Sequence, residues 1–563
     1  MSRRQIGDKS VVSQTSKSTR LLRFMSKRSL LIVLSVVAVI DLIVCLLPVR
    51  WDMTDDKHYS LSGASKQLLR TTGEPVRITL YLQGDLNAGF RRLKKAAEET
   101  IEEMSVYADI QSSCAQDPKE AESLGLHPTI IHEREQNGKT AQTTVYPYAL
   151  VQYRDKKAVA VLLHNTRGLS GEENLNASIE QLEFAFMEAL HQVLQNETPR
   201  VAFIEGHGET DELHTYDLMT ALSRYYQVDR GQLTDDPHVL DDYKAVIIAD
   251  PQTAFSEADK YIIDQYIMRG GAVLWAVNGV QLSEEVLQSE GYTPVLPLDL
   301  GITEMLFRYG IRISPALVQD LQCLPIPVNV STDPTQTNLQ PMPWTFAPLL
   351  LASQGSPVTK NLGQVMSMFV SPIDAVGGDD GIEKRVLLAT STASCVNPAP
   401  NEVNLSDMNP PTELFRYQYV PVAVSMEGVF HSVFAHRIVP EGINTDEPVR
   451  KQSIRTRQVV IAGGSILSNE LLKGQPLPMG YDRYSGMQFS NRDMAVNSIL
   501  WLTDADGLIS LREKTVVLRL LNDKRAYDER LSVQLVSTIS PIVILALIGC
   551  AVAIGRRRKY QRI

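Results

Sequence analysis

The sequence predicts a mixed α/β protein that is anchored in a membrane at both ends. One apolar stretch near each end is long enough to cross a bilayer. Between the two stretches, short apolar runs alternate with segments whose apolar residues recur every three or four positions. This alternation is typical of strands and amphipathic helices that form parallel βαβ units.

The candidate membrane spans are Ser29–Val49, with Asp41 as its one charged residue, and Leu531–Gly555, which has no charge. At ~1.5 Å per residue, each is long enough for a hydrocarbon core of ~30 Å. A cleaved signal peptide or a lipoprotein signal are alternatives for the first span. The exit Leu47-Pro48-Val49-Arg50 fits signal cleavage poorly, and Val44 is too large for the position before a lipidated Cys45. We therefore expect an uncleaved anchor.

Charge predicts how the chain crosses the membrane. Residues 1–28 carry eight basic side chains and residues 556–563 carry five, so the positive-inside rule places both tails in the cytoplasm. The body between the spans, 50–530, then lies on the other side. It holds 42 basic and 63 acidic residues, a net charge of about −21. Nucleic-acid binders show the opposite balance, so we expect no nucleic-acid partner.

Residues 50–197 are predicted to form the first domain. Its strands are 76–82, one near Ile110, and a hairpin of 145–153 with 158–163; its helices begin at Gly89, Lys119 and Ser170. The last of these is expected to be one long helix that continues to Val193. The order β-α-β-α-β-β-α is that of a thioredoxin-like domain. Cys114 stands alone, so the redox dithiol of such domains is absent.

Residues 198–508 are predicted to form a doubly wound α/β domain. The expected strands are 201–205, 227–233, 244–249 and 272–277, with a helix that begins after Ser256 and stops at Gly270-Gly271. A Pro- and Ser-rich segment at about 284–450 is expected to be a long insertion. The sheet is then expected to resume at 458–462, followed by a helix from Asn491. Residues 509–530 are predicted to be a strand (514–521) and a linker.

The candidate site is the turn after the first strand of this second domain, Glu205-Gly206-His207-Gly208-Glu209, with Asp211 just beyond it. Ligands of doubly wound sheets bind at the carboxyl ends of the strands, where this turn would lie. Glu205, His207, Glu209 and Asp211 are therefore the candidate ligand- or partner-binding residues.

Metal binding and catalysis are weighed as alternatives for this turn. Glu212 and His214 would add metal ligands, but the spacing matches no metal motif, so we expect no metal. The expected nucleophile position, Ala249-Asp250-Pro251-Gln252, holds neither Ser nor Cys, so we expect no catalytic residue. The chain also lacks a Gly-x4-Gly-Lys-Ser/Thr phosphate loop. Cys323 and Cys395, with Cys114, make an odd number of cysteines without a CxxC pair, so no zinc site or disulfide framework is predicted, and at most one bridge among them is open. We also expect no cofactor.

Segments along nearly the whole chain carry a resemblance to a known family. They are Asp52–Ser62, Glu74–Val76, Gly84-Asp85, Gly89–Leu93, Leu175–Glu183, Glu205–Glu209, Ile263–Gly271, Leu306–Ile313, Val318–Gln322, Met479–Asp482 and Leu511–Lys514. Taken in order, they resemble the GldG-type auxiliary, or substrate-binding, component of gliding-motility-associated ABC transporters. Gly463-Gly464 departs from the pattern, because many relatives carry an acidic residue there (Ser-Asp-Gly-Asp).

The resemblance implies a location, a fold and partners. Such proteins are thought to lie in the inner membrane of Bacteroidota-type bacteria, with a periplasmic body, beside a separate permease and ATPase. The central domain resembles a module of an intraflagellar transport protein with a glutamine-amidotransferase-like α/β fold.

A charge in the middle of a membrane span costs roughly 2.5–3.5 kcal/mol, so Asp41 is expected either to contact a permease helix or to be tolerated in its protonated form.

The function expected from these observations is that of a non-catalytic, extracytoplasmic accessory subunit of an ABC transporter. Two alternatives remain open. One is an extracytoplasmic hydrolase that uses the amidotransferase-like sheet, which the missing nucleophile disfavours. The other is a structural coupler to envelope machinery, because a protein anchored at two points differs from a freely diffusing receptor.

Overall fold

The computed structural model describes residues 35, 60–84, 86–117, 119–134, 140–163, 171–195, 197–329, 338–377, 381–407, 410–504, 509, 511 and 529–560. The chain divides into two compact units, Met1–Ser60 and Leu61–Ile563. In the first unit only Ser35 and Ser60 are described, so the predicted span 29–49, with Asp41, lies outside the described residues. The predicted strand 514–521 also lies outside them.

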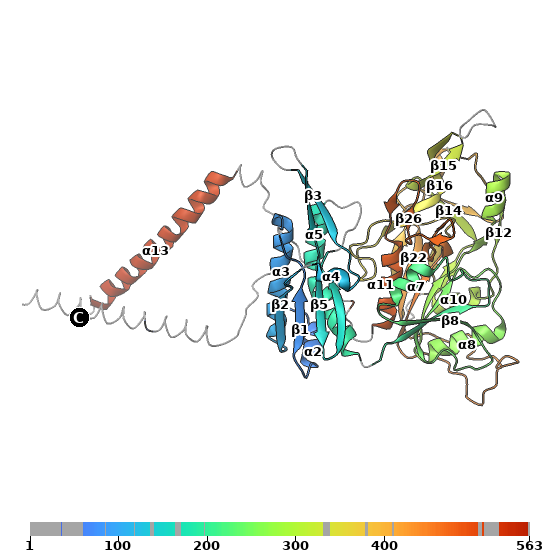
Figure 1. Cartoon of the computed structure of the whole chain (residues 1–563), viewed down its shortest axis with the longest axis horizontal. Helices are drawn as coiled ribbons and strands as arrows, with labels where there is room; N and C mark the ends of the chain where they lie inside the picture. The colour runs from blue at the N-terminus through green and yellow to red at the C-terminus, as the bar shows by residue number, and fades with distance from the viewer. Residues whose placement is uncertain are drawn as a thin grey trace, which may run out of the picture. The chain divides into compact units, whose positions relative to one another are not determined.

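The amino-terminal part of the second unit contains a four-stranded sheet in the order β2-β1-β5-β6 (Figure 1). Strand β1 pairs in parallel with β2 and antiparallel with β5, which pairs antiparallel with β6. The strands are β1 (Val76–Leu80), β2 (Ile110–Cys114), β5 (Tyr148–Tyr153) and β6 (Lys156–Val161).

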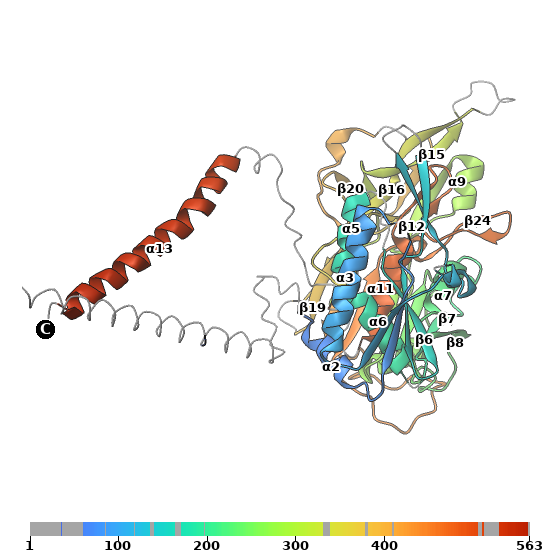
Figure 2. The ribbon, with the colours of Figure 1, turned by 60° about the vertical axis from the view of Figure 1, so that its left-hand side comes forward.

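Helices pack on one face of this sheet. Helices α3 (Ala88–Ser105) and α6 (Leu182–Leu194) bury their apolar stripes in the same core as the inward side chains of β1 and β5. Helix α5 (Gly171–Glu180) lies beside α3 (Figure 2). A short helix, α2 (Gly63–Arg70), is capped by the Ser62 hydroxyl, which accepts the Ser65 amide.

Three local features differ from the sequence prediction. The expected long helix is two helices, α5 and α6, separated at Gln181. The expected hairpin 145–153/158–163 is tighter, because β5 begins at Tyr148 and only Arg154-Asp155 separate it from β6. Apolar alternation also missed a hairpin of β3 (Thr129–Arg134) with β4 (Thr140–Val145), which follows the short α4 (Glu120–Ser123).

A ten-stranded sheet forms the core of the rest of the unit. One half is parallel, in the order β8-β7-β9-β10-β23. Its strands are β7 (Arg200–Glu205), β8 (Gln227–Gln232), β9 (Tyr243–Ala249), β10 (Ala272–Ala276) and β23 (Thr456–Ile461). The sheet therefore resumes at β23, beside β10, as the apolar run at 458–462 predicts.

The other half of this sheet is antiparallel and comes from the segment expected to be an insertion. It continues from β23 in the order β22-β19-β16-β15, with β17 (Val365–Met366) also paired to β16. Its strands are β22 (Pro421–Gly428), β19 (Glu383–Ala389), β16 (Leu339–Ala352) and β15 (Cys323–Asn329). Residues 284–450 thus extend the main sheet.

Helices cover both faces of the parallel half. Helices α7 (Tyr216–Leu222) and α11 (Asn491–Thr503) pack on one face, where Val201 and Leu274 point. Helix α8 (Glu257–Met268) packs on the other face with fully buried Trp275. Alternate strand residues enter the two layers, which explains why the strands read as continuous apolar runs.

Smaller elements surround the large sheet. They are β11 (Val280–Gln281), α9 (Glu284–Glu290), β12 (Tyr292–Pro297), α10 (Thr303–Tyr309), β13 (Ile311–Ile313), β14 (Ala316–Asp320), β18 (Ile373–Ala375), β20 (Ser394–Pro398), β21 (Asn401–Asn404), η1 (Thr412–Leu414), η2 (Gly464–Leu467), β24 (Leu471–Leu472), β25 (Gln475–Pro476), β26 (Tyr481–Asp482) and β27 (Met487–Gln488).

The last described helix is α13 (Arg530–Tyr560). Its segment Gln534–Ile554, 21 residues, is long and apolar enough to cross a membrane. This segment, which is identified by its length and composition alone, lies within the predicted span 531–555. The chain is thus a mixed α/β protein with one candidate membrane helix among its described residues.

Candidate functional site

The turn after β7 lies at the carboxyl edge of the parallel strands. Gly206 has φ +116° and Gly208 φ +77°, left-handed conformations that favour glycine. The carbonyl of His207 between them accepts the amides of Gln252 and Thr253, at 2.8 and 2.9 Å. The loops that follow the neighbouring strands β7 and β9 are therefore hydrogen-bonded directly to each other.

His207 is buried between two carboxylates. Its Nδ1 lies 2.9 Å from Oε1 of Glu209, and its Nε2 lies 3.2 Å from Oδ2 of Asp259. Glu209 also accepts the His207 amide at 2.7 Å, and its side chain is 2% exposed. The imidazole stacks on the ring of Phe255, with centroids 3.8 Å apart and 21° between the planes.

Asp259 is held in place by the start of α8. It forms a capping box with Ser256: the Ser256 hydroxyl accepts the Asp259 amide at 3.1 Å, and Asp259 Oδ2 accepts the Ser256 amide at 3.3 Å. The same Oδ2 accepts the Ser256 hydroxyl at 2.5 Å. The carboxylate that fixes the helix terminus is thus also the partner of His207.

Two opposed effects act on the protonation of His207. Burial disfavours a positive charge on the ring, but the hydrogen bonds to Glu209 and Asp259 and their negative charges outweigh it and raise the pKa of His207. A doubly protonated ring donates to both carboxylates at once. In that protonated form the ring links the β7 turn to α8 through both carboxylates.

Glu205, the last residue of β7, has a different partner. Its Oε1 accepts Arg230 Nε at 2.7 Å. The guanidinium of Arg230, on β8, also donates to the Thr215 hydroxyl at 2.7 Å and the Thr210 carbonyl at 2.8 Å. It lies 5.2 Å from the centroid of the Phe203 ring. Arg230 thus holds the segment that leads into α7 against the end of β7.

Asp211 lies further out and is paired locally. Its Oδ1 accepts the His214 amide at 2.9 Å and lies 2.8 Å from Nδ1 of His214. The backbone hydrogen bond from His214 is the main cause that lowers the pKa of Asp211. Its side chain is 64% exposed, whereas that of Glu205 is 40% exposed. Both carboxylates can be reached from solvent.

Further along the same edge, the side chains of Asp250 and Asn278 join three loops. Asp250, which follows β9 and has φ +58°, accepts Asn278 Nδ2 at 2.6 Å. Asn278 Oδ1 in turn accepts the Gly464 amide at 3.0 Å. Burial is the main cause that raises the pKa of Asp250 to about 6. The ends of β9, β10 and β23 are tied together by this chain of hydrogen bonds.

The hydrogen bonds of the β7 turn suit a structural link between this turn and α8 better than the activation of a nucleophile. Both ring nitrogens of His207 face carboxylates, and the Ser256 hydroxyl donates to Asp259. A nucleophile–base pair would instead need a hydroxyl or thiol bonded to an imidazole nitrogen. Within the part of the chain that the structure describes, no group of three or more His, Cys, Asp or Glu side chains is placed to hold a metal ion.

The four predicted residues are therefore only partly brought together. His207 and Glu209 form one cluster, whereas Glu205 and Asp211 belong to separate pairs; Asp41 lies outside the described residues. Sequence reasoning missed Asp259 as a member of the His207 cluster. Its position in the Ser256 capping motif gave a signal for the helix terminus but none for the histidine.

Comparison with known families connects this sheet with transport. The model of the family described as "ABC-type uncharacterized transport system" (ABC_transp_aux) matches residues 198–498, more than half of the 563-residue chain. The chain belongs to this family. The match begins just before β7 and ends within α11, so the family region contains the whole ten-stranded sheet and the β7 turn.

Membership of this transport-system family agrees with the auxiliary component that the sequence resemblance implies. The GldG-type assignment is finer than this match and stays a prediction. A second model, Domain of unknown function (DUF7088), matches residues 55–152.

Two further comparisons add little. No curated protein matches the chain. Seven chains of solved structures match, among them the mmIFT52 N-terminal domain, with 15% identity, 55% of this chain and 98% of that chain covered, and a TM-score of 0.32. At this TM-score the similarity supports no statement about the fold or function of this family member.

Proposed function

We propose that the chain is a non-catalytic, extracytoplasmic accessory subunit of an ABC transporter, of the GldG-type gliding-motility-associated class. The observation that carries this proposal is the family match over residues 198–498. Within the transport system the chain would bind substrate or act as an auxiliary arm of the permease. The sequence has no phosphate-binding loop of the Gly-x4-Gly-Lys-Ser/Thr type, so ATP hydrolysis belongs to another subunit.

In this proposal the body has two domains. Residues 50–197 form a thioredoxin-like domain, which the strand order β2-β1-β5-β6 supports. Residues 198–508 form a doubly wound, amidotransferase-like domain, supported by its five parallel strands with helices on both faces. Residues 509–530 then lead to the second span.

Both ends of the chain would be anchored in the inner membrane. The spans are 29–49 and 531–555, with the basic tails 1–28 and 556–563 in the cytoplasm and the body in the periplasm. The excess of basic residues in the two tails, 1–28 and 556–563, and the acidic net charge of the body support this topology. Asp41 would contact a helix of the permease, because a mid-span carboxyl group is costly without a polar partner.

The β7 turn would be a recognition edge on the body. Glu205 and Asp211 supply exposed carboxylates, while buried His207 and Glu209 hold the turn in shape. A basic partner surface suits these two acids, and the net charge of the body reinforces that preference.

Affinity purification of the tagged full chain from its native membrane, followed by mass spectrometry, tests the proposal. We expect an ABC permease and an ABC ATPase among the enriched proteins, and weaker enrichment of both with the Asp41→Leu variant. An inserted, folded chain that enriches neither subunit would contradict an accessory role. Enrichment unchanged by Asp41→Leu would reject the proposed permease contact alone.

A further inference from the structure

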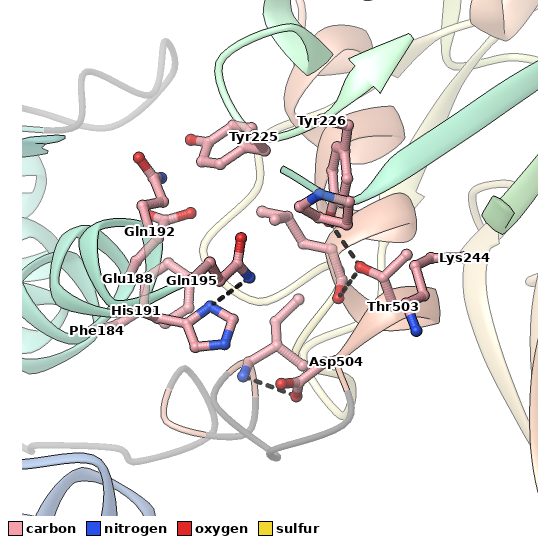
Figure 3. A pocket seen from close by; sticks show the side chains of 13 residues that line it. Phe184, Glu188, His191, Gln192, Gln195, Tyr225, Tyr226, Lys244, Thr503 and Asp504 are labelled. Atoms are coloured by element: carbon pink, nitrogen blue, oxygen red, sulfur yellow. Dashed lines mark hydrogen bonds between the residues drawn. The ribbon is translucent and has the colours of Figure 1, made fainter. Parts of the chain in front are cut away.

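A cavity of about 250 Å³ lies at the opposite edge of the parallel sheet from the β7 turn. It is bordered by α6, by the segments that lead into β7 and β8, by the start of β9 and by the end of α11. Figure 3 shows side chains of α6 on one side of it and Thr503 and Asp504 on the other. A molecule bound there would contact α6, which packs on the four-stranded sheet, and the segments at the start of the parallel strands of the ten-stranded sheet.

The size of the cavity suits a small molecule. With a liquid volume of ~30 Å³ per water molecule, 250 Å³ corresponds to on the order of eight waters. Pockets that enclose small organic ligands begin at a similar volume, roughly 300 Å³.

Aromatic rings form much of the apolar lining. Phe184 comes from α6, and Tyr225 and Tyr226 precede β8, with their ring centroids 6.2 Å apart. Phe184 and Tyr226 are buried, and the Tyr226 hydroxyl shares a 2.6 Å hydrogen bond with the Thr503 hydroxyl, which fixes that ring against α11. The faces of such rings attract cations, most strongly where water is partly excluded.

Two acidic side chains line the cavity. Glu188 on α6 and Asp504 at the end of α11 both line it, and one carboxylate oxygen of Glu188 is buried. Burial is the main cause that raises the pKa of Tyr226, and the negative charges of Glu188 and Asp504 raise it further. Lys244 is the one permanently cationic side chain among the described residues that line the cavity, and it is exposed.

We propose that this cavity binds a small organic ammonium ion, held by Glu188 and Asp504 and by the faces of the Tyr225 and Tyr226 rings. The inference goes beyond the accessory role and does not depend on it, because it rests only on the cavity and its lining. The positive charge of Lys244 repels a cationic ligand, so it lowers the affinity of the cavity for that ligand.

Ligand-observed NMR on the full chain in detergent, with benzylamine as the cationic probe and benzyl alcohol as its neutral counterpart, tests the proposal. We expect saturation transfer to benzylamine and about five-fold weaker binding of benzyl alcohol, the effect of one exposed ion pair. Equal binding of both probes, or no binding of benzylamine, would overturn the assignment.

Charge variants separate binding from folding defects. Glu188→Gln and Asp504→Asn should each weaken benzylamine binding by up to about five-fold. Lys244→Gln should strengthen it, a gain that misfolding cannot produce. Glu290→Gln, on α9 and outside the lining, is the matched control and should change nothing. Benzylamine binding that is insensitive to Glu188→Gln, Asp504→Asn and Lys244→Gln alike would place the probe elsewhere and reject this site.

Discussion

The Nε2 atom of His207 lies 3.2 Å from Oδ2 of Asp259, although 52 positions separate these residues in the chain. One imidazole thereby joins the turn after β7 to the first turn of α8. Because Nδ1 is also paired, with Glu209, the imidazole contacts a carboxylate of the turn and one of the helix at the same time.

Removing this link should destabilise the protein. We expect His207→Ala to lower the free energy of unfolding by about 2 kcal/mol, because it removes the imidazole partner of two carboxylates and the ring stacked on Phe255. Thermal unfolding of the full chain in detergent measures the effect. His238→Ala is the control, since His238 pairs with Asp241 at an exposed site, and should cost less than about 0.5 kcal/mol.

The stabilisation by His207 should depend on pH. Burial lowers its pKa, but hydrogen bonds to Glu209 and Asp259 prevail, so the folded pKa exceeds the unfolded value of ~6.5. The contribution is therefore complete below about pH 6.5 and is lost as the pH rises through the folded value. The difference in Tm between the wild type and His207→Gln should be largest near pH 6 and shrink toward alkaline pH. A difference that grows with pH would contradict the imidazolium link.

The stability of the protein should depend strongly on Asp264 of α8. Its buried carboxylate accepts the Tyr309 hydroxyl at 2.8 Å, the Ser432 hydroxyl at 2.6 Å, the Val433 amide at 3.1 Å and the Gln265 side-chain amide at 2.9 Å. Asp264→Ala leaves these buried donors without an acceptor and should cost about 3 kcal/mol in thermal unfolding.

The conservative variant Asp264→Asn keeps one acceptor oxygen and should cost clearly less than Asp264→Ala. Equal losses for the two variants would mean that side-chain volume, and not hydrogen bonding, determines the effect at this position.

The space beside Gly464 is filled by Asp250. A Cβ atom at position 464 would lie 2.1 Å from Cγ of Asp250, so Gly464→Ala should destabilise the protein by about 2 kcal/mol. Asp250→Gly removes that side chain and also relieves the left-handed backbone at φ +58°.

A double-mutant cycle measured by thermal unfolding tests this steric coupling. The double variant Asp250→Gly/Gly464→Ala should be more stable than the sum of the two single effects predicts. Strict additivity would mean that the two side-chain positions do not compete for one space.

The parallel strands could be predicted from the sequence because each is a continuous apolar run buried on both faces. The predicted 201–205 and 244–249 match β7 and β9 within one residue at each end. Helix α8 could be predicted because Ser256 and Asp259 form a capping motif at its start. Such signals are local, so they locate elements along the chain.

The pairing of strands could not be predicted in the same way. The apolar pattern of 384–389 indicates a strand but not its neighbour, so the extension of the sheet by β19 and β22 was missed. The contact between His207 and Asp259 could not be predicted for the same reason. The sequence predicts a helix that begins after Ser256, and only the packing of α8 beside β7 and β9 brings the carboxylate of Asp259 to the imidazole.

The ATPase activity of the complex tests the proposed accessory role of the chain. The permease and ATPase that co-purify with this chain would be reconstituted in lipid with and without it, and ATP hydrolysis would be measured in both preparations. We expect that the chain alone hydrolyses no ATP and that adding it changes the rate of ATP hydrolysis by the permease–ATPase pair. An identical rate with and without the chain, or hydrolysis by the chain alone, would contradict its assignment as a non-catalytic accessory subunit.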